Sequence, residues 1–396
     1  MRRPQGRTRA LLLACAIGAA AGWLGVRPAE PAPPSAPLFA VDPAPSAPSS
    51  TASPEPTTTT RKPPPANACG TLAAKLPLRD RLGQLVMAGL DPADEAAATR
   101  VVTVDKVGAV FVGGTATHLL TGGRLAALRA KATVPLLTAV DEEGGRVQRI
   151  DALDGPTPSA RQLAATMSPE QVTAVAHRRG EQLRSRGVVM DLAPVVDVSD
   201  AAANTVIGDR SFSADPATVG TYAGAYSDGL RRAGVIPVLK HFPGHGRGSG
   251  DSHLGLVRTP PLAALRADDL RPYATLIPRG EPVVMLGHLD VPGLTGGVPA
   301  SLSPAAYRLL RENYRFAGVA MTDDLGAMRA VTDSYSLPDA VTTAITAGAD
   351  IALWSAPAPT GPVLDRLERA VRTGELPQSR VRDAVTHVLR LKTGCV

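Results

Sequence analysis

Charged residues are scarce in this chain, and aromatic residues are scarcer. Of the 396 residues, 20% are charged and 3% are aromatic, whereas 44% are hydrophobic. This balance is typical of a globular protein that is long enough for one large domain or two small ones. The net charge of +6 owes much to four arginines among the first nine residues. The excess of basic residues therefore does not indicate a nucleic-acid partner.

The segment from Arg27 to about Asn67 has almost no aromatic residue around which a core could form. Proline, alanine, serine and threonine dominate it, which excludes a folded domain and predicts a disordered, extended tether over residues 27–68. The preceding segment begins with basic residues and continues as an uncharged, apolar stretch from residue 10 to 26. This order predicts a signal peptide or an uncleaved membrane anchor over residues 1–26.

Cysteine is also rare, with three residues in the whole chain. Cys15, in the sequence Leu-Leu-Ala-Cys, offers a further possibility, a lipidated cysteine after cleavage. In each case we expect the body to be exported, to the extracellular space or the outer face of the cytoplasmic membrane. Cys69 and Cys395 lie at the two ends of the remaining domain, residues 69–396. In an oxidising compartment a disulfide between them would tie these ends together; the alternative is two free thiols.

The hydrophobic runs of this domain are short, and they alternate with longer amphipathic stretches. Several of the stretches have Ser or Asp before Pro at their start, which predicts helices such as 169–184, 216–232, 304–314 and 337–347. Eight such alternations predict an α/β protein, a single (β/α)8 barrel of the TIM type with no further domain after it. The predicted strands cover residues 82–90, 107–114, 134–140, 188–198, 235–239, 282–289, 318–321 and 351–354.

The sequence KHFPGHGRGSGDSHLGL, residues 240–256, is rich in polar groups and follows the fifth predicted strand. Active sites of parallel α/β barrels form at such strand ends. Asp251 is close enough to His253 to hold one ring nitrogen and favour the imidazolium, which predicts an acid/base dyad. Glycines at positions 246, 248 and 250 predict a loop that moves over the site when substrate binds. The alternative is a solvated surface loop with incidental histidines.

A metal site is the competing interpretation of the same stretch. His241, His245, Asp251 and His253 are all possible zinc ligands, and the HxxxH spacing would join two imidazoles on a helix. A proline and a glycine between the two histidines interrupt any such helix. The spacing therefore does not favour a metal, and we expect no cofactor.

Two aspartates follow the seventh predicted strand, in the sequence MTDDLGAM. A carboxylate fixed at a strand end opposite a histidine loop suits covalent catalysis, in which it attacks carbon while a general acid protonates the leaving group. We expect Asp323 to be this nucleophile and Asp324 to point aside or support the loop. Both aspartates could instead cap the next helix.

Two further segments carry groups that suit a ligand with many hydroxyls. The sequence DEEGGRVQR, from Asp141 to Arg149, follows the third predicted strand, and Arg210 lies beyond the fourth. Singly, each group could form a structural ion pair. With the histidine loop and the two aspartates, such groups stand at four different strand ends, which indicates a ligand site.

Together these motifs resemble a known family. KHFPGHG followed by DSH, with DEEGGRVQR, VIGDRSF and TDDLGAM, is similar to the family 3 β-N-acetylhexosaminidases, the peptidoglycan-recycling β-N-acetylglucosaminidases. The resemblance keeps the order and spacing of the motifs over nearly all of residues 72–394. Its Asp and His pair separates this branch from the β-glucosidases of the family, whose acid is a carboxylate from another domain. Glu142 and Asp191 stand where the family often has Gln or His and Asn, respectively.

The resemblance implies roles at the matching positions. Asp323 would be the nucleophile and His253 the acid/base, oriented by Asp251. The implied activity is that of a retaining exo-β-N-acetylglucosaminidase, which releases terminal GlcNAc from GlcNAc-MurNAc cell-wall saccharides through a covalent intermediate and needs no cofactor. A β-glucosidase or xylosidase, a GlcNAc phosphorylase and a catalytically silent wall-binding protein are the alternatives. The positions that would hold GlcNAc are Asp141, Arg149, Arg210, Lys240 and His241.

Overall fold

The computed structural model describes residues 68–395. The predicted signal peptide or anchor, Cys15 and nearly all of the predicted tether lie outside these residues, so these predictions and the domain boundaries that rest on them stay predictions. No helix within residues 68–395 is long and apolar enough to cross a membrane.

The core of the described part is one parallel sheet that nearly closes into a barrel. Its strand order is β5-β4-β3-β2-β1-β11-β10-β8-β6. In the chain only Val238 separates β5 from β6, so the two edges of the sheet are joined. The strands are β1 (Val86–Leu90), β2 (Ala109–Val112), β3 (Leu137–Val140), β4 (Met190–Asp191), β5 (Ile236–Pro237), β6 (Leu239–Phe242), β8 (Val283–Leu286), β10 (Val319–Asp324) and β11 (Ile351–Trp354).

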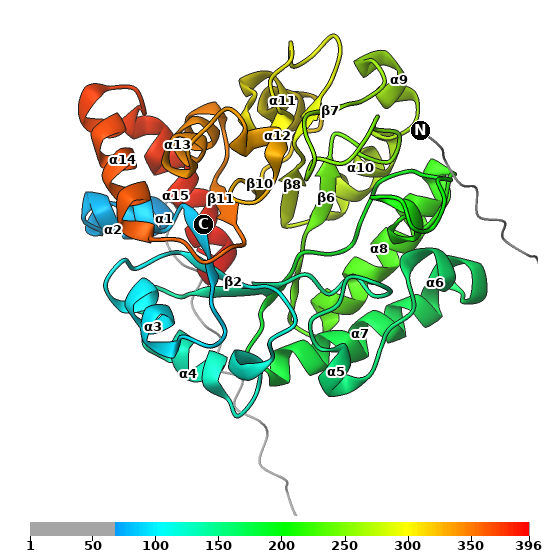
Figure 1. Cartoon of the computed structure of the whole chain (residues 1–396), viewed down its shortest axis with the longest axis horizontal. Coiled ribbons are helices and arrows are strands. Elements are labelled where there is room, and N and C mark those ends of the chain that lie inside the picture. Colours follow the sequence, from blue (N-terminus) through cyan, green and yellow to red (C-terminus); the bar gives the residue numbers. More distant parts are fainter. Residues whose placement is uncertain (1–67, 396) are drawn as a thin grey trace, which may run out of the picture. The chain divides into compact units, whose positions relative to one another are not determined.

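The helices lie around the outside of this sheet, as Figure 1 shows. Because helices cover one face and barrel side chains fill the other, nearly all residues of the barrel strands are buried, as is usual for parallel sheets. This arrangement confirms the α/β class and is consistent with a TIM-type barrel. The helices are α1 (Ala68–Lys75), α2 (Leu78–Gly83), α3 (Glu95–Thr103), α4 (Arg124–Ala130), α5 (Asp151–Asp154), α6 (Ala160–Thr166), α7 (Pro169–Ser185), α8 (Pro216–Arg232), α9 (Leu262–Ala267), α10 (Arg271–Leu276), α11 (Pro304–Arg308), α12 (Arg329–Thr332), α13 (Leu337–Ala347), α14 (Thr360–Thr373) and α15 (Gln378–Thr393).

The bounds of several predicted elements differ from those in the structure. The first predicted strand, residues 82–90, begins too early, because residues 82 and 83 close α2 and the strand starts at Val86. The predicted helix 304–314 is α-helical only to Arg308 and continues as a π-helical turn, Leu309–Asn313. A short second sheet, β7 (Val257–Arg258) with β9 (Leu289–Asp290), was not predicted.

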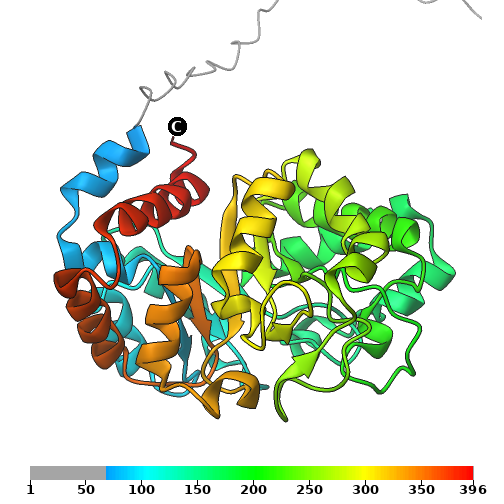
Figure 2. The same cartoon turned by 90° about the horizontal axis from the view of Figure 1, so that it is seen from above.

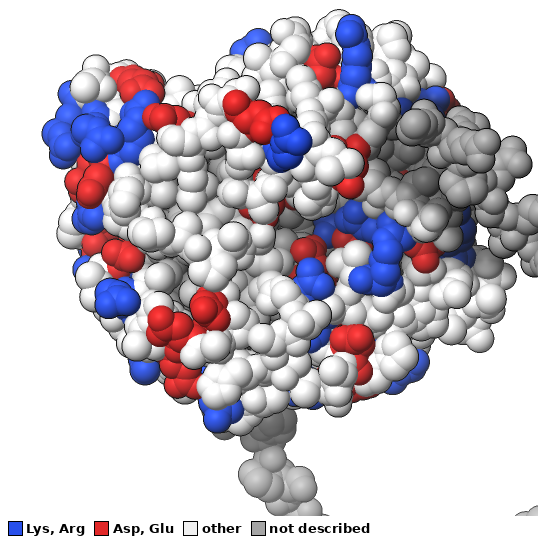
Figure 3. Space-filling view, in the orientation of Figure 1, with Lys and Arg blue, Asp and Glu red and all other residues white. Residues whose placement is uncertain are grey.

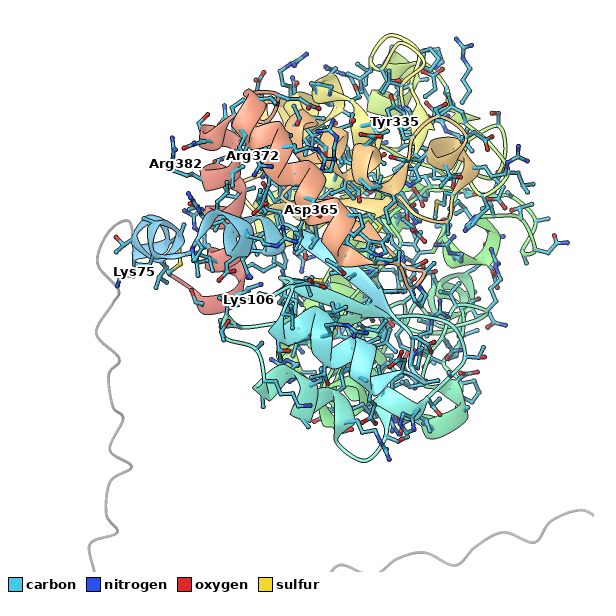
Figure 4. All side chains as sticks on the ribbon, turned by 60° about the vertical axis from the view of Figure 1, so that its left-hand side comes forward. Lys75, Lys106, Tyr335, Asp365, Arg372 and Arg382 are labelled. Atoms are coloured by element: carbon cyan, nitrogen blue, oxygen red, sulfur yellow. A yellow bond between two sulfur atoms is a disulfide. The ribbon has the colours of Figure 1, made fainter. Side chains whose placement is uncertain are left out.

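The ends of the described domain are joined by a disulfide between Cys69 and Cys395, whose Cα atoms are 5.3 Å apart. Cys69 lies on α1, and Cys395 follows α15. The two helices pack against each other, and Figure 2 shows them side by side as the first blue helix and the last red one. Figure 4 shows these helices from another direction, with Lys75 at the end of α1 and Arg382 on α15.

Candidate active site

A cavity of about 710 Å³ opens where the strands of the barrel end. On the face seen in Figure 3, acidic and basic side chains gather around a hollow. All five residues predicted to hold the sugar line this cavity, as do the predicted nucleophile and acid/base. The titratable residues in its wall are Asp91, Asp141, Glu143, Arg149, Arg210, Lys240, His241, His245, His253, Asp323 and Asp324.

Glu143 organises the cationic side of the cavity. Its carboxylate accepts two hydrogen bonds from Arg210, of 2.7 and 2.8 Å. Lys240 Nζ lies 2.6 Å from both Glu143 Oε1 and Asp141 Oδ1. Burial alone would raise the pKa of Glu143, but the positive charges of Arg210 and Lys240 outweigh it and hold the pKa far below its ordinary value. Arg149 completes the group, with Nη2 3.9 Å from Asp141 Oδ2.

The sequence analysis did not single out Glu143, although a signal was present. Asp141 and Glu143 are two positions apart just beyond β3, and residues two apart in an extended chain point to the same side. The alternation of side chains could therefore have placed both acids in the cavity. Glu142, between them, is fully buried on the other side and accepts a hydrogen bond of 2.6 Å from the backbone N–H of Arg149.

His241 is held in one orientation by a buried carboxylate. Its Nδ1 lies 2.7 Å from Asp197 Oδ2, and its Nε2 lies 3.5 Å from Arg210 Nη2. Burial opposes ionisation of Asp197, but the charge of His241 and its hydrogen bond lower the pKa of this carboxyl group. Because an ionised carboxylate only accepts, His241 Nδ1 donates to Asp197, and this contact fixes the ring with Nε2 toward Arg210. Lys240 and His241 belong to β6 rather than to the loop in which they were predicted.

Asp323 lies on β10 and is 8% exposed. Burial alone would raise the pKa of this carboxyl group, but His241, His288 and the backbone N–H of Asp324 together lower it. The group is therefore ionised and faces the cavity, as a nucleophile requires. The strand includes both aspartates, whereas the sequence analysis ended it at residue 321.

Asp324 supports the loop beyond the strand. Its Oδ1 accepts hydrogen bonds from the backbone N–H groups of Gly326, at 2.8 Å, and Ser355, at 3.2 Å. The hydroxyl of Ser355 also donates to its Oδ2. These contacts tie the segment after β10 to the segment after β11.

The predicted acid/base pair is present as a contact. The ring nitrogen Nδ1 of His253 lies 2.7 Å from Asp251 Oδ1, which also accepts from the backbone N–H of His253 at 2.9 Å. Burial of Asp251 acts to raise its pKa, but these hydrogen bonds lower it below the ordinary value. The carboxylate thus orients the ring with Nε2 free. The His253 side chain is 56% exposed, so it can reach a proton acceptor at the mouth of the cavity.

His245 was considered only as a possible metal ligand, and its contacts are different. Its backbone N–H donates to Asp197 at 2.7 Å, and its ring packs edge-on against His241, with centroids 5.9 Å apart. Burial lowers the pKa of this imidazole. It is thus a neutral ring in the wall of the cavity.

One group of three potential metal ligands is present among residues 68–395, and it lies elsewhere. Asp350, Asp383 and His387 approach one another at the start of β11, the end of the barrel opposite the cavity. Asp350 is already paired with the guanidinium groups of Arg311 and Arg380, each at 2.5 Å. Its charge is therefore balanced without a metal ion.

Comparisons with known proteins show the family to which the chain belongs. The β-hexosaminidase LpqI of Mycobacterium tuberculosis is 52% identical over 328 residues, which cover 81% of this chain and 84% of that protein. The crystal structure of a family 3 glycosyl hydrolase from Mycobacterium smegmatis matches at 51% identity and a TM-score of 0.78, and covers 81% of this chain and 98% of that one.

A family 3 β-N-acetylglucosaminidase from a Paenibacillus species matches at 32% identity and a TM-score of 0.75, and covers 80% of this chain and 62% of that one. Residues 77–391 match the family described as the glycosyl hydrolase family 3 N-terminal domain. The chain therefore belongs to glycosyl hydrolase family 3 and is a glycoside hydrolase.

Proposed function

We propose that this protein is a retaining exo-β-N-acetylglucosaminidase that removes terminal GlcNAc from peptidoglycan fragments. The observation that carries the proposal is that the wall of one cavity contains both a buried, ionised Asp323 and His253, whose ring is oriented by the Asp251 carboxylate. The relatives named for β-hexosaminidase and β-N-acetylglucosaminidase activity support the choice of an N-acetylated sugar.

The charged side of the cavity would hold the sugar to be released. This side supplies acceptors from its acids and donors from its bases, so a sugar hydroxyl could either donate or accept a hydrogen bond there. The acids are Asp141 and Glu143, and the bases are Arg149, Arg210 and Lys240. His241 adds a ring fixed by Asp197. Charge-assisted hydrogen bonds from so many groups to one terminal sugar would favour an enzyme that acts on a chain end.

The two chemical steps follow from the two groups. In the first, an oxygen of Asp323 attacks the anomeric carbon, the bond to the glycosidic oxygen breaks, and protonated His253 gives its proton to that oxygen. In the second, neutral His253 takes a proton from water, the water oxygen attacks the anomeric carbon, and Asp323 leaves. Two displacements at the same carbon return the β-configuration.

The proposed place of action is outside the cytoplasm. A disulfide between the two ends of the domain suits an oxidising compartment, and the predicted signal or anchor with its extended tether would place the barrel near the cell wall.

A panel of nitrophenyl β-glycosides tests the activity. We expect the purified protein to hydrolyse the GlcNAc glycoside at a kcat/KM at least roughly 100-fold above the glucoside and xyloside, because acceptor and donor groups left unpaired in a polar site reject an analogue strongly. Nuclear magnetic resonance of the first product should show the β-anomer, and free GlcNAc rather than a sugar phosphate should form in phosphate buffer. Preference for glucose, the α-anomer or no turnover would refute the proposal.

A further inference from the structure

The residue between the two members of the dyad, Ser252, is held by the segment that follows the proposed nucleophile. Ser252 is 3% exposed, whereas its neighbour His253 is exposed. Its hydroxyl donates to the Met328 sulfur at 3.3 Å, and its carbonyl accepts from the backbone N–H of Ala330 at 3.1 Å. Met328 precedes α12, which directly follows the loop after β10 (Figure 1).

That segment is itself fixed to the barrel. The backbone N–H of Leu325 donates to Leu353 on β11 at 2.9 Å, and Asp324 holds Gly326 and Ser355. Residues 323–330 therefore form a continuous, hydrogen-bonded connection between Asp323 and Ser252. A shift of the catalytic strand would be transmitted to the dyad.

The other attachments of the histidine loop lead away from the nucleophile. Arg247 donates to Asp269, beyond α9, at 3.0 Å, and Ser249 exchanges hydrogen bonds with Arg258 on β7. Within residues 68–395, both hydrogen bonds that join the turn 251–253 to residues 319–330 are made by Ser252. Ser252 is thus the residue through which this turn is bonded to the segment after Asp323.

We propose that Ser252 is a positioning residue, which fixes His253 relative to Asp323 by fastening the dyad to Met328 and Ala330. The proposal rests on the proposed function of Asp323 and His253. Catalysis by a positioned acid is sensitive to errors of about an ångström, so loosening this attachment would slow proton transfer without removing any reacting group.

Ser252→Ala tests the inference, with Ser249→Ala as its matched control. Both changes remove one hydroxyl from the same loop, but Ser249 is exposed and bonded only to Arg258. For GlcNAc linked to a poor sugar leaving group, we expect Ser252→Ala to lower kcat/KM by roughly three- to tenfold, the effect of one hydrogen bond. For dinitrophenyl GlcNAc, which needs no proton, the loss should be below about twofold. Ser249→Ala should change neither rate.

Two further variants separate positioning from general damage. Ser252→Thr keeps the hydroxyl and should restore most of the lost rate, and Met328→Leu keeps the volume but removes the sulfur acceptor, so it should reproduce the leaving-group bias. If Ser252 acts only through His253, then Ser252→Ala added to His253→Ala should cause no further loss.

The outcomes distinguish this inference from the proposed function. Absence of turnover of both GlcNAc substrates by the wild-type protein would overturn the proposed function. If the wild type is active, three results would overturn the positioning role alone. Ser252→Ala could behave like Ser249→Ala, it could lower kcat/KM equally for both leaving groups, or its full loss could add to that of His253→Ala.

Discussion

At the scale of single residues, the two groups proposed to carry the chemistry differ greatly in exposure. Asp323 is buried on a strand among His241, His288 and Lys240, which keep its carboxyl group ionised. His253 stands on a turn in solvent and is oriented by its own neighbour, Asp251. The buried group is held by the barrel, and the exposed group is held by the chain next to it.

Removal of the His253 ring should affect substrates according to their leaving group. Because a general acid contributes roughly 10²- to 10⁴-fold, we expect His253→Ala to lower kcat/KM by at least about 100-fold for a GlcNAc disaccharide. For dinitrophenyl GlcNAc, under conditions that limit the first step, the loss should be less than about tenfold. Asp251→Asn should show the same bias more weakly, since it keeps the ring. Steady-state kinetics with both substrates measure this, and an equal loss on both would mean that the proton comes from another group.

The contacts of these residues could be predicted only where the two partners lie close together in the sequence. Asp251 and His253 are two residues apart, so the sequence predicted their contact. Glu143 pairs with Arg210, 67 residues away, and Asp197 with His241, 44 residues away. Such pairs depend on which strand ends meet, so the sequence analysis named Arg210 and His241 without pairing them with Glu143 and Asp197.

At the scale of helices and strands, local signals determined which boundaries were predicted well. The helix α8 has the predicted bounds, because Asp215 caps it and Pro216 occupies its first turn. The β10 boundary was wrong because Asp323 and Asp324 are polar, whereas a strand that ends in an active site includes polar residues. The apolar pattern alone therefore ended the strand before its two aspartates.

The nearly closed sheet depends on contacts that no local pattern contains. The run 188–198 was predicted as a long strand, but only Met190 and Asp191 pair in β4, and Val195 forms a separate bridge to Lys240. The strands β5 and β6 lie at opposite edges of the sheet, and this bridge helps to bring the two edges together. The alternation of elements indicated a barrel, and only the structure shows how its last pairs are made.

At the scale of the whole molecule, the disulfide closes almost the entire domain into a loop, since Cys69 and Cys395 are 326 positions apart. A cross-link of this span lowers the entropy of the unfolded chain, which chain-entropy models value at about 4 to 5 kcal/mol before any strain. We expect Cys69→Ser to lower the free energy of unfolding by up to this amount, measured by urea denaturation under oxidising conditions. Cys395→Ser should lose as much, and the double variant should lose no more than either. No loss in either single variant would contradict a stabilising role.

The account rests most directly on Asp323 as the residue that becomes covalently attached to the sugar. An activated, fluorinated GlcNAc analogue should trap this intermediate, because fluorine slows both steps whereas the activated leaving group speeds only the first. Mass spectrometry of proteolytic peptides should then locate the added sugar on Asp323, and Asp323→Asn, which nearly keeps the volume of the side chain, should be folded, inactive and unlabelled. A sugar found on Asp324 instead, or turnover that continues in Asp323→Asn, would contradict the account.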